Sequence, residues 1–285
     1  MSPDVLKMAT RNTLKSHGAR VADSESPAKD FGRFAGNPNF LLSLARGLKV
    51  IEVFEGHTEG VSAAEVSRRT GLSRAAVRRV LMTLELLGYA WSEGRVYRLN
   101  SRVMRLGFSY LSSSSLATLA QPILEHVIEL VHESSSLGVL EGDEVVYVAR
   151  ATAKRVMSVG LSVGSRFPAY CTSMGRVLLS GLTDEELTAY FNRIQLKRLT
   201  PKTIVDKETL TDLIARVRID GFALNNEELE LGHRSIAVPV KDRRDRMVAG
   251  MNIGVHAARV SSTDMTERLL PILREHSQML GQLLR

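Results

Sequence analysis

The sequence predicts an α/β protein of two domains: an N-terminal winged helix-turn-helix and a C-terminal α+β domain with an antiparallel sheet. Three observations support this prediction. The chain has 285 residues, enough for two separate hydrophobic cores. Residues 40–100 have the pattern of three helices followed by a β-hairpin, which is the order of a winged helix-turn-helix. After four serines at 112–115, hairpin strands alternate with amphipathic helices.

Composition and local pattern place the domain boundaries. Residues 1–39 are polar, contain Gly and Pro, and have no sustained hydrophobic period, so we expect a mobile arm. We expect the winged domain at 40–100 and a linker helix with a hinge at 101–115. The second domain should then occupy 116–285.

Composition and charge narrow the class of protein. No apolar run approaches the roughly 20 residues that span a bilayer, and the N-terminus lacks a signal-peptide core. The single cysteine, Cys171, suits a reducing compartment, so we expect a cytoplasmic protein without membrane contact. Residues 41–105 carry 11 Lys and Arg against 6 Asp and Glu. That local positive charge favours a polyanionic partner.

The first helix is predicted at 40–56. Its inner stripe is expected to contain Leu44, Leu48 and Ile51, extended by Leu41 and Phe54.

The segment 62–88 is predicted to form two helices joined by a tight turn. Ser62 caps the first helix, with Glu65 at the spacing of a capping box. Gly71 suits the left-handed position that ends a helix, and Ser73 caps the second helix.

The second of these helices has the two faces that a DNA-recognition helix needs. Its buried stripe is expected to comprise Val77, Val80, Leu81, Leu84 and Leu87. The opposite face carries Ala75, Arg78, Arg79 and Met82. Arginine pairs with guanine or grips phosphate, and a small residue permits close approach. An ordinary amphipathic surface helix with solvated arginines is the alternative.

A β-hairpin at 89–100, turning at Ser92-Glu93-Gly94, supplies the wing. Arg95 lies at its tip, within reach of a phosphate or the minor groove. The predicted DNA contacts are therefore Ser73, Arg74, Ala75, Arg78, Arg79 and Arg95.

Elements of the second domain follow from the same patterns. Helices are expected at 116–133, 173–180, 184–191, 207–220 and 263–284, the last bent at Pro271. Strands are expected at 137–140, 144–149, 155–161, 235–240 and 247–256.

Four segments together resemble the IclR family of bacterial transcription regulators. They are LARGLKVIEVF (44–54), GLSRAAVRRVLMTLELLGY (71–89), PAYCTSMGRVLLS (168–180) and GFALNNEELELGHRSIAVPV (221–240). The second and third segments are similar in sequence to members of the branch that controls aromatic-acid catabolism through the β-ketoadipate pathway. The resemblance implies an operator in double-stranded DNA, a GAF-like effector domain, and a homodimer or a dimer of dimers. It also implies 4-hydroxybenzoate, protocatechuate or β-ketoadipate as effector. Because many members are activators, RNA polymerase is a further implied partner.

The resemblance also implies an effector site. The matching positions are Val156, Val159, Phe167, Tyr170, Ser173, Met174, Asn225, Ser235, Asn252 and Gly254. The start of the helix at Ser173 offers N–H groups and a helix dipole to a carboxylate, with Arg155 and Arg166 as candidate partners. Tyr170 stands where many relatives have histidine, and His233 where the branch more often has an aliphatic residue. The alternative is that the apolar members only pack a core.

Other functions fit the residues less well. Cys171 with His233 as base would suit a thiol enzyme, but the sequence has no adjacent signature, so no catalytic residue is assigned. No CxxC, metal-spaced histidines or phosphate-binding loop occurs, so no metal or cofactor is expected. An architectural DNA-binding protein would not need a second domain. A repressor that senses a non-aromatic carboxylate is the remaining alternative.

Overall fold

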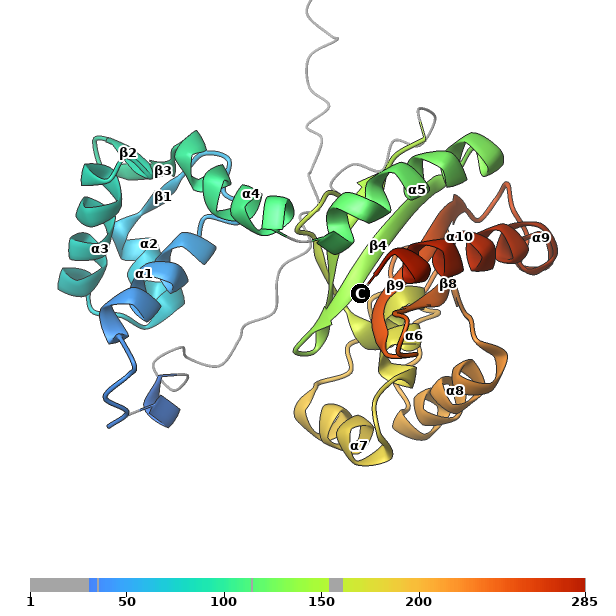
Figure 1. Cartoon of the computed structure of the whole chain (residues 1–285). Helices are drawn as coiled ribbons and strands as arrows, with labels where there is room; N and C mark the ends of the chain where they lie inside the picture. The colour runs from blue at the N-terminus through green and yellow to red at the C-terminus, as the bar shows by residue number, and fades with distance from the viewer. Residues whose placement is uncertain (1–30, 35, 114, 154–160, 285) are drawn as a thin grey trace, which may run out of the picture. The chain divides into compact units, whose positions relative to one another are not determined.

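A computed structural model describes residues 31–34, 36–113, 115–153 and 161–284. The chain divides into two compact units at Phe108 and Ser109, a division within the predicted linker (Figure 1). Each unit has its own buried core. The predicted two-domain fold class is confirmed.

The N-terminal unit is a winged helix-turn-helix. After the short helix η2 (Gly32–Phe34), its elements are α1 (Leu42–Glu52), β1 (Val61–Ser62), α2 (Ala63–Thr70), α3 (Arg74–Leu86), β2 (Ala90–Glu93) and β3 (Val96–Leu99). The strands pair antiparallel in the order β1-β3-β2. Val66, Val77 and Leu81 are fully buried among these elements and hold the helices together.

The predicted caps of α2 and α3 are largely confirmed. The Ser62 hydroxyl accepts from the Glu65 N–H at 3.2 Å, and the Ser73 hydroxyl accepts from the Ala76 N–H at 3.2 Å. Gly71 has a φ of 67°, the left-handed conformation that glycine adopts without strain. The capping box is incomplete, because the Glu65 carboxylate accepts hydrogen bonds from the side chains of Arg68 and Arg69 instead.

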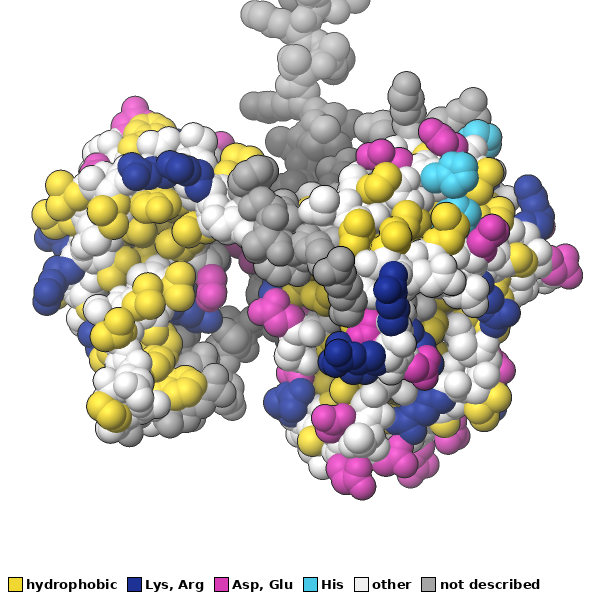
Figure 2. Space-filling view, viewed as in Figure 1, with side chains coloured by type: hydrophobic (Ala, Val, Ile, Leu, Met, Phe, Trp, Pro, Cys, Tyr) yellow, Lys and Arg dark blue, Asp and Glu magenta, His cyan; other side chains and the backbone are white. Residues whose placement is uncertain are grey.

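The prediction for the inner face of α1 is partly wrong. Leu41, Leu44 and Leu48 are 66%, 58% and 50% exposed. Val50 and Phe54 are the buried residues here, so the helix is rotated relative to the predicted stripe. Figure 2 shows the resulting group of exposed hydrophobic side chains over α1.

The segment 101–131 is almost entirely helical. A short turn, η3 (Ser101–Val103), leads into α4 (Met104–Ser113), and α5 (Ser115–Val131) follows. The run of four serines therefore contains the end of one helix and the start of the next. Ser114, at the predicted hinge, lies outside the described residues.

The C-terminal unit is built on a six-stranded antiparallel sheet. Its strands are β4 (Ser134–Glu141), β5 (Glu144–Ala151), β6 (Arg166–Pro168), β7 (Ala223–Asn226), β8 (His233–Lys241) and β9 (Met247–His256). Their order is β6-β5-β4-β9-β8-β7. The edge strands β6 and β7 were not predicted, because each is only three or four residues long. Residues 155–160 of the predicted strand 155–161 lie outside the described residues.

Helices cover both faces of this sheet, as Figure 1 shows. α5 and α10 (Leu270–Leu283) pack on one face around a core that includes Leu137 and Met251. α6 (Ser173–Ser180), α7 (Asp184–Arg193) and α8 (Lys207–Asp220) lie on the other face, around a core that includes Met174 and Tyr190. The predicted bend near Pro271 coincides with α9 (Ser262–Asp264) and a π-turn, η5 (Met265–Leu269). Across the described residues, no helix is long and apolar enough to cross a membrane.

Candidate functional site

The outer face of α3 is an exposed basic surface. Val77, Leu81 and Leu84 are buried against the unit, as predicted. The opposite side of the helix and its cap are exposed, namely Ser73, Arg74, Ala75, Arg78, Arg79 and Met82. Leu87, predicted to be buried, is 53% exposed because α3 ends at Leu86. Figure 2 shows Lys and Arg side chains along the outer edge of α3.

The arginines of α3 differ in their partners from the arginines of α2. Glu65 binds Arg68 and Arg69, and these hydrogen bonds lower the pKa of its carboxyl to about 2. Within the described ranges, Arg74, Arg78 and Arg79 form no ion pair with an acidic side chain. Their positive charge is therefore available to a polyanion.

Three arginines lie in or next to the wing. One is exposed at its tip, and the other two pack against aromatic rings. Arg95 is exposed at the hairpin tip, directly after Gly94, whose φ is 62°. The Arg98 guanidinium lies 5.7 Å from the centre of the Trp91 ring, and that of Arg102 lies 5.3 Å from the centre of the Tyr89 ring. Arg98 and Arg102 thus support the wing through cation–π contacts, and Arg95 is the residue that projects from it.

A second candidate site lies on the face of the large sheet that packs against α6. A row of paired residues crosses three strands here: Arg150 on β5 lies opposite Ser136 on β4, which lies opposite Asn252 on β9. In the next row, Tyr147 pairs with Gly138. Successive rows on one face of a sheet are two residues apart, so a spacing of three between Tyr147 and Arg150 needs an irregularity.

That irregularity is a β-bulge in β5. Leu137 pairs with Ala149 and Gly138 pairs with Tyr147, so Val148 is an extra residue without an opposite partner. The bulge turns Arg150 onto the same face as Tyr147. Regular alternation along β5 would have placed the two side chains on opposite faces.

The first residues of α6 lie over this face of the sheet and line the site. Thr172 caps the helix by accepting from the Gly175 N–H at 3.0 Å, which leaves Ser173 as the first helical residue. The hydroxyls of Ser173 and Ser235 are 2.7 Å apart and both are buried. Met174 is fully buried and packs over Gly138 and Gly250, where a Cβ would come within 3.4 Å of it.

The side-chain oxygen of Asn252 has no hydrogen-bond donor among the described residues. Its side chain is 5% exposed, and its Oδ1 accepts no hydrogen bond from the part of the chain that the structure describes. A buried amide oxygen without a donor costs free energy, so such atoms commonly mark a ligand or water position. Burial raises the pKa of the nearby Tyr147 phenol to about 12, although the Arg150 charge and the Asn252 amide oppose it.

His233 borders the row on the other side. A Cβ on Gly254 would come within 3.0 Å of its Nε2, so the ring covers that glycine. Burial lowers the pKa of His233, and the charge of Arg150 acts in the same direction, while Glu230 opposes them. The imidazole is therefore held in its neutral form at neutral pH.

The structure brings Ser173, Met174, Ser235, Asn252 and Gly254 together, as the sequence analysis expected. Phe167 joins them through Tyr147, whose ring it meets edge-on with 5.6 Å between centres. Val156, Val159 and Arg155 lie outside the described residues.

Two of the expected contacts, Tyr170 and Asn225, also have hydrogen-bond partners within the protein. The Tyr170 hydroxyl donates to the Lys197 carbonyl at 2.7 Å and accepts from the Lys197 N–H at 3.0 Å. The Asn225 amide donates to the Cys171 carbonyl at 2.7 Å, and its oxygen accepts from the Glu228 N–H at 3.4 Å. Both side chains are thus occupied in fixing loops around α6.

Arg166 also differs from its expected role as a carboxylate partner of the effector. Its guanidinium binds Glu141 and Glu144 at 3.1 and 2.8 Å, on the β4–β5 hairpin.

Sequence reasoning missed Ser136, Tyr147 and Arg150 as members of this site. Tyr147 was expected in a strand, but a strand pattern does not reveal which face of the sheet meets α6. Arg150 was missed because its orientation depends on the bulge at Val148.

Cys171 has the environment of a core thiol. Its Sγ lies 3.7 Å from the Pro168 carbonyl oxygen, and burial raises its pKa to about 12. A nucleophilic thiol requires the opposite shift. In the described ranges, no group of three His, Cys, Asp or Glu side chains could hold a metal ion.

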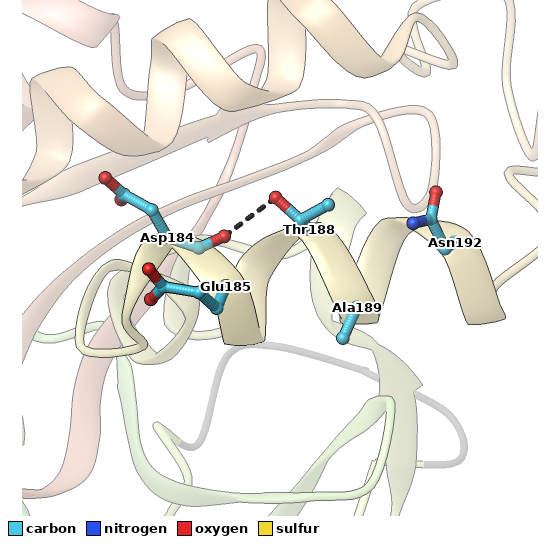
Figure 3. Close-up of a pocket in the computed structure, with 5 residues that line it drawn as sticks. All are labelled: Asp184, Glu185, Thr188, Ala189 and Asn192. Atoms are coloured by element: carbon cyan, nitrogen blue, oxygen red, sulfur yellow. Dashed lines mark hydrogen bonds between the residues drawn. The ribbon is translucent and has the colours of Figure 1, made fainter.

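A shallow pocket on the surface of α7 does not have the features of an effector site (Figure 3). Its lining comes from that helix alone: Asp184, Glu185, Thr188, Ala189 and Asn192. The Thr188 hydroxyl is already engaged by the Asp184 carbonyl at 2.8 Å. The Asp184 carboxylate is paired with the Arg218 guanidinium at 2.6 Å, and Glu185 adds a second carboxylate, so the lining offers no free cation to an anionic effector among the described residues.

Comparison with known families gives two matches. The family described as "Bacterial transcriptional regulator IclR C-terminal" matches residues 108–281, and "IclR helix-turn-helix domain" matches 43–93. The Pca regulon regulatory protein of Pseudomonas putida is 47% identical over 249 residues, covering 87% of this chain and 86% of its own. The p-hydroxybenzoate hydroxylase transcriptional activator of Acinetobacter baylyi is 37% identical over 86% of this chain and 92% of its own.

Solved structures agree with these matches. A transcriptional regulator from Rhodococcus sp. RHA1 superposes with a TM-score of 0.76 and 45% identity, over 86% of this chain and 98% of its own. A double mutant of the PobR inducer-binding domain from Acinetobacter, in complex with 3-hydroxybenzoic acid, has a TM-score of 0.57 and 35% identity, over 60% of this chain and 100% of its own. An IclR homologue from Microbacterium hydrocarbonoxydans, in complex with 4-hydroxybenzoate, has a TM-score of 0.71 and 26% identity, over 84% of this chain and 97% of its own.

Proposed function

The chain belongs to the IclR family of bacterial transcriptional regulators, and we propose that it controls genes of aromatic-acid catabolism in response to a small aromatic carboxylic acid. The observation that carries this proposal is that one chain has both an exposed basic face on α3 and a buried polar site beside α6. A regulator needs both a surface for the operator and a separate site for the effector. The relatives named for the Pca regulon and for p-hydroxybenzoate hydroxylase support the pathway. The hydroxybenzoate complexes of two similar structures support the effector class.

In this proposal the winged domain comprises 40–100, the linker 101–115 and the effector domain 116–285. Ser73, Arg74, Ala75, Arg78, Arg79 and Arg95 contact the operator. The effector site contains Val156, Val159, Phe167, Tyr170, Ser173, Met174, Asn225, Ser235, Asn252 and Gly254. Effector binding alters DNA occupancy through the linker, and a coupling of about 1–3 kcal/mol would change operator affinity roughly 5- to 150-fold.

We propose that the protein acts as a homodimer or a dimer of dimers. If it activates transcription, RNA polymerase is a further partner. The exposed leucines of α1 support self-association, because a lone chain would leave them in water. It works as a regulator rather than an enzyme, in keeping with its relatives and with the buried Cys171 thiol.

Arg78→Ala tests the DNA half of the proposal. We expect operator affinity to fall by about 1–3 kcal/mol, because one bidentate arginine contributes that much discrimination. Fluorescence anisotropy with the DNA upstream of the neighbouring genes measures the change, and calorimetry with 4-hydroxybenzoate should show unaltered effector affinity.

Arg216→Ala is the matched control, since Arg216 is an exposed arginine on α8 of the other unit. Unchanged operator binding by the Arg78 variant would contradict the assignment of α3. Loss of both operator and effector binding would contradict two separate sites.

A further inference from the structure

The sheet face beneath α6 has a charged end and an acceptor end. Arg150 and Asn252 belong to one row, with Ser136 between them. Adjacent strands are about 4.7–4.9 Å apart, so the two Cα atoms are separated by roughly 10 Å.

The guanidinium of Arg150 extends inward along this row. Its Nη1 donates to the Ser136 hydroxyl at 3.2 Å, which draws it from β5 over β4 towards β9. Burial lowers the pKa of Arg150, with the Tyr147 phenol acting in the opposite direction. A partly desolvated guanidinium gains more from a bound carboxylate than an exposed one does.

The other end of the row lacks a donor. Asn252 Oδ1 is buried and accepts no hydrogen bond within the described part of the chain. An amide oxygen accepts hydrogen bonds and does not donate them, so its complement is a hydroxyl group and not a second carboxylate. Met174 borders the row on one side and the His233 ring borders it on the other.

We propose that Arg150 holds the carboxylate of the effector and that Asn252 Oδ1 accepts the hydrogen of its ring hydroxyl. Ser136 is a positioning residue that directs the Arg150 guanidinium across the sheet. This inference rests on the proposed function and specifies how the effector is oriented. It makes Arg150 and Asn252 the residues that select a hydroxylated aromatic acid over an unsubstituted acid or an uncharged amide.

The test combines two variants with three compounds. Calorimetry on the full chain measures affinities for 4-hydroxybenzoate, benzoate, which lacks the hydroxyl, and 4-hydroxybenzamide, which lacks the charge. For the wild-type chain we expect 4-hydroxybenzoate to bind at least about tenfold more tightly than either analogue. The amide loses the charge-assisted interaction with the Arg150 guanidinium, and benzoate supplies no hydroxyl to Asn252 Oδ1.

Each variant should remove one preference and retain the other. In Arg150→Gln, the preference for the acid over the amide should fall to about one, and the preference for the hydroxyl should persist. In Asn252→Leu, the hydroxyl preference should disappear and the acid preference should persist. Arg150→Lys, which keeps the charge but loses the planar fork, should retain part of the acid preference.

Arg166→Gln is the matched control, because Arg166 lies near the same sheet but binds Glu141 and Glu144. It should leave all three affinities unchanged. Circular dichroism and the melting temperature establish whether each variant is folded. If Arg150→Gln does not fold, Arg150→Lys is used in its place, and its acid preference should fall below that of the wild-type chain.

The outcomes separate the two proposals. If the wild-type chain binds the acids but Arg150→Gln keeps its acid preference, or Asn252→Leu its hydroxyl preference, the orientation is wrong and the proposed function stands. If the wild-type chain binds none of the three compounds, the proposed effector class fails, and the orientation fails with it.

Discussion

At the scale of single residues, the ion pair between Arg176 and Glu228 is buried and bidentate. Both side chains are at most 7% exposed, and their two N–O distances are 2.7 and 2.6 Å. Arg176 Nε also donates to the Tyr170 carbonyl at 3.0 Å. The pair therefore ties the 226–232 turn to the start of α6, where Ser173 meets the candidate effector site. Such a pair fixes geometry even where it adds little net stability.

Glu228→Ala should destabilise the C-terminal unit by about 3–5 kcal/mol, because it leaves the buried Arg176 charge without its partner. Urea denaturation followed by circular dichroism measures the loss. The double variant Arg176→Met with Glu228→Leu should recover much of the stability, since no charge then remains buried. Glu52→Ala, which breaks an exposed pair with Lys49 on α1, is the control and should change stability little. Similar small losses for Glu228→Ala and Glu52→Ala would contradict this account.

At the scale of secondary-structure elements, the position of α6 decides the shape of the candidate effector site. Gly175 allows the helix to lie directly on the preceding turn, because a Cβ there would be only 2.1 Å from the Ala169 carbonyl oxygen. That contact is with backbone and cannot be relieved by a side-chain rotation. Met174 and Ser173, one and two residues earlier, depend on the same placement.

Gly175→Ala should displace α6, lower the unfolding free energy by about 1–3 kcal/mol and weaken effector binding. Gly47→Ala is a matched control in a helix, since a Cβ at Gly47 meets nothing within 4 Å. It should be neutral or stabilise by about 0.5–1 kcal/mol, because alanine favours helix. Thermal unfolding and calorimetry with 4-hydroxybenzoate give both quantities. A Gly175 variant as stable as the Gly47 variant would show that close packing of α6 is unimportant.

At the scale of the whole molecule, the exposed leucines of α1 bear on assembly. Leu44 and Leu48 lie one turn apart and are each at least half exposed. An apolar stripe on the surface of a small unit is stabilised when a second surface covers it.

The double variant Leu44→Gln with Leu48→Gln should weaken self-association, seen in sedimentation velocity as a lower mean mass at equal concentration. Met279→Gln, which changes an exposed apolar residue on α10, should leave the mass unchanged. If the α1 variant has the same mean mass as the wild-type chain at every concentration, including those at which the wild-type oligomer dissociates, these leucines are not part of the interface.

Much of the fold was determined by local sequence alone. Serine caps, left-handed glycines and apolar spacing act over a few residues, so they placed α2, α3, α6 and α8 and the outward arginines of α3 correctly. These features depend on hydrogen bonds and residue spacing within about one turn of helix. Such spacing can be read directly from the sequence.

Only the tertiary structure decided how those elements face one another. The apolar spacing of α1 allows more than one inner stripe, and packing chose the one with Val50 and Phe54 over Leu44 and Leu48. In β5, pairing with β4 created the bulge at Val148, which turned Arg150 onto the face of Tyr147. The side-chain direction of a strand residue depends on the register of its neighbours across the sheet, and that register is set by contacts distant in sequence.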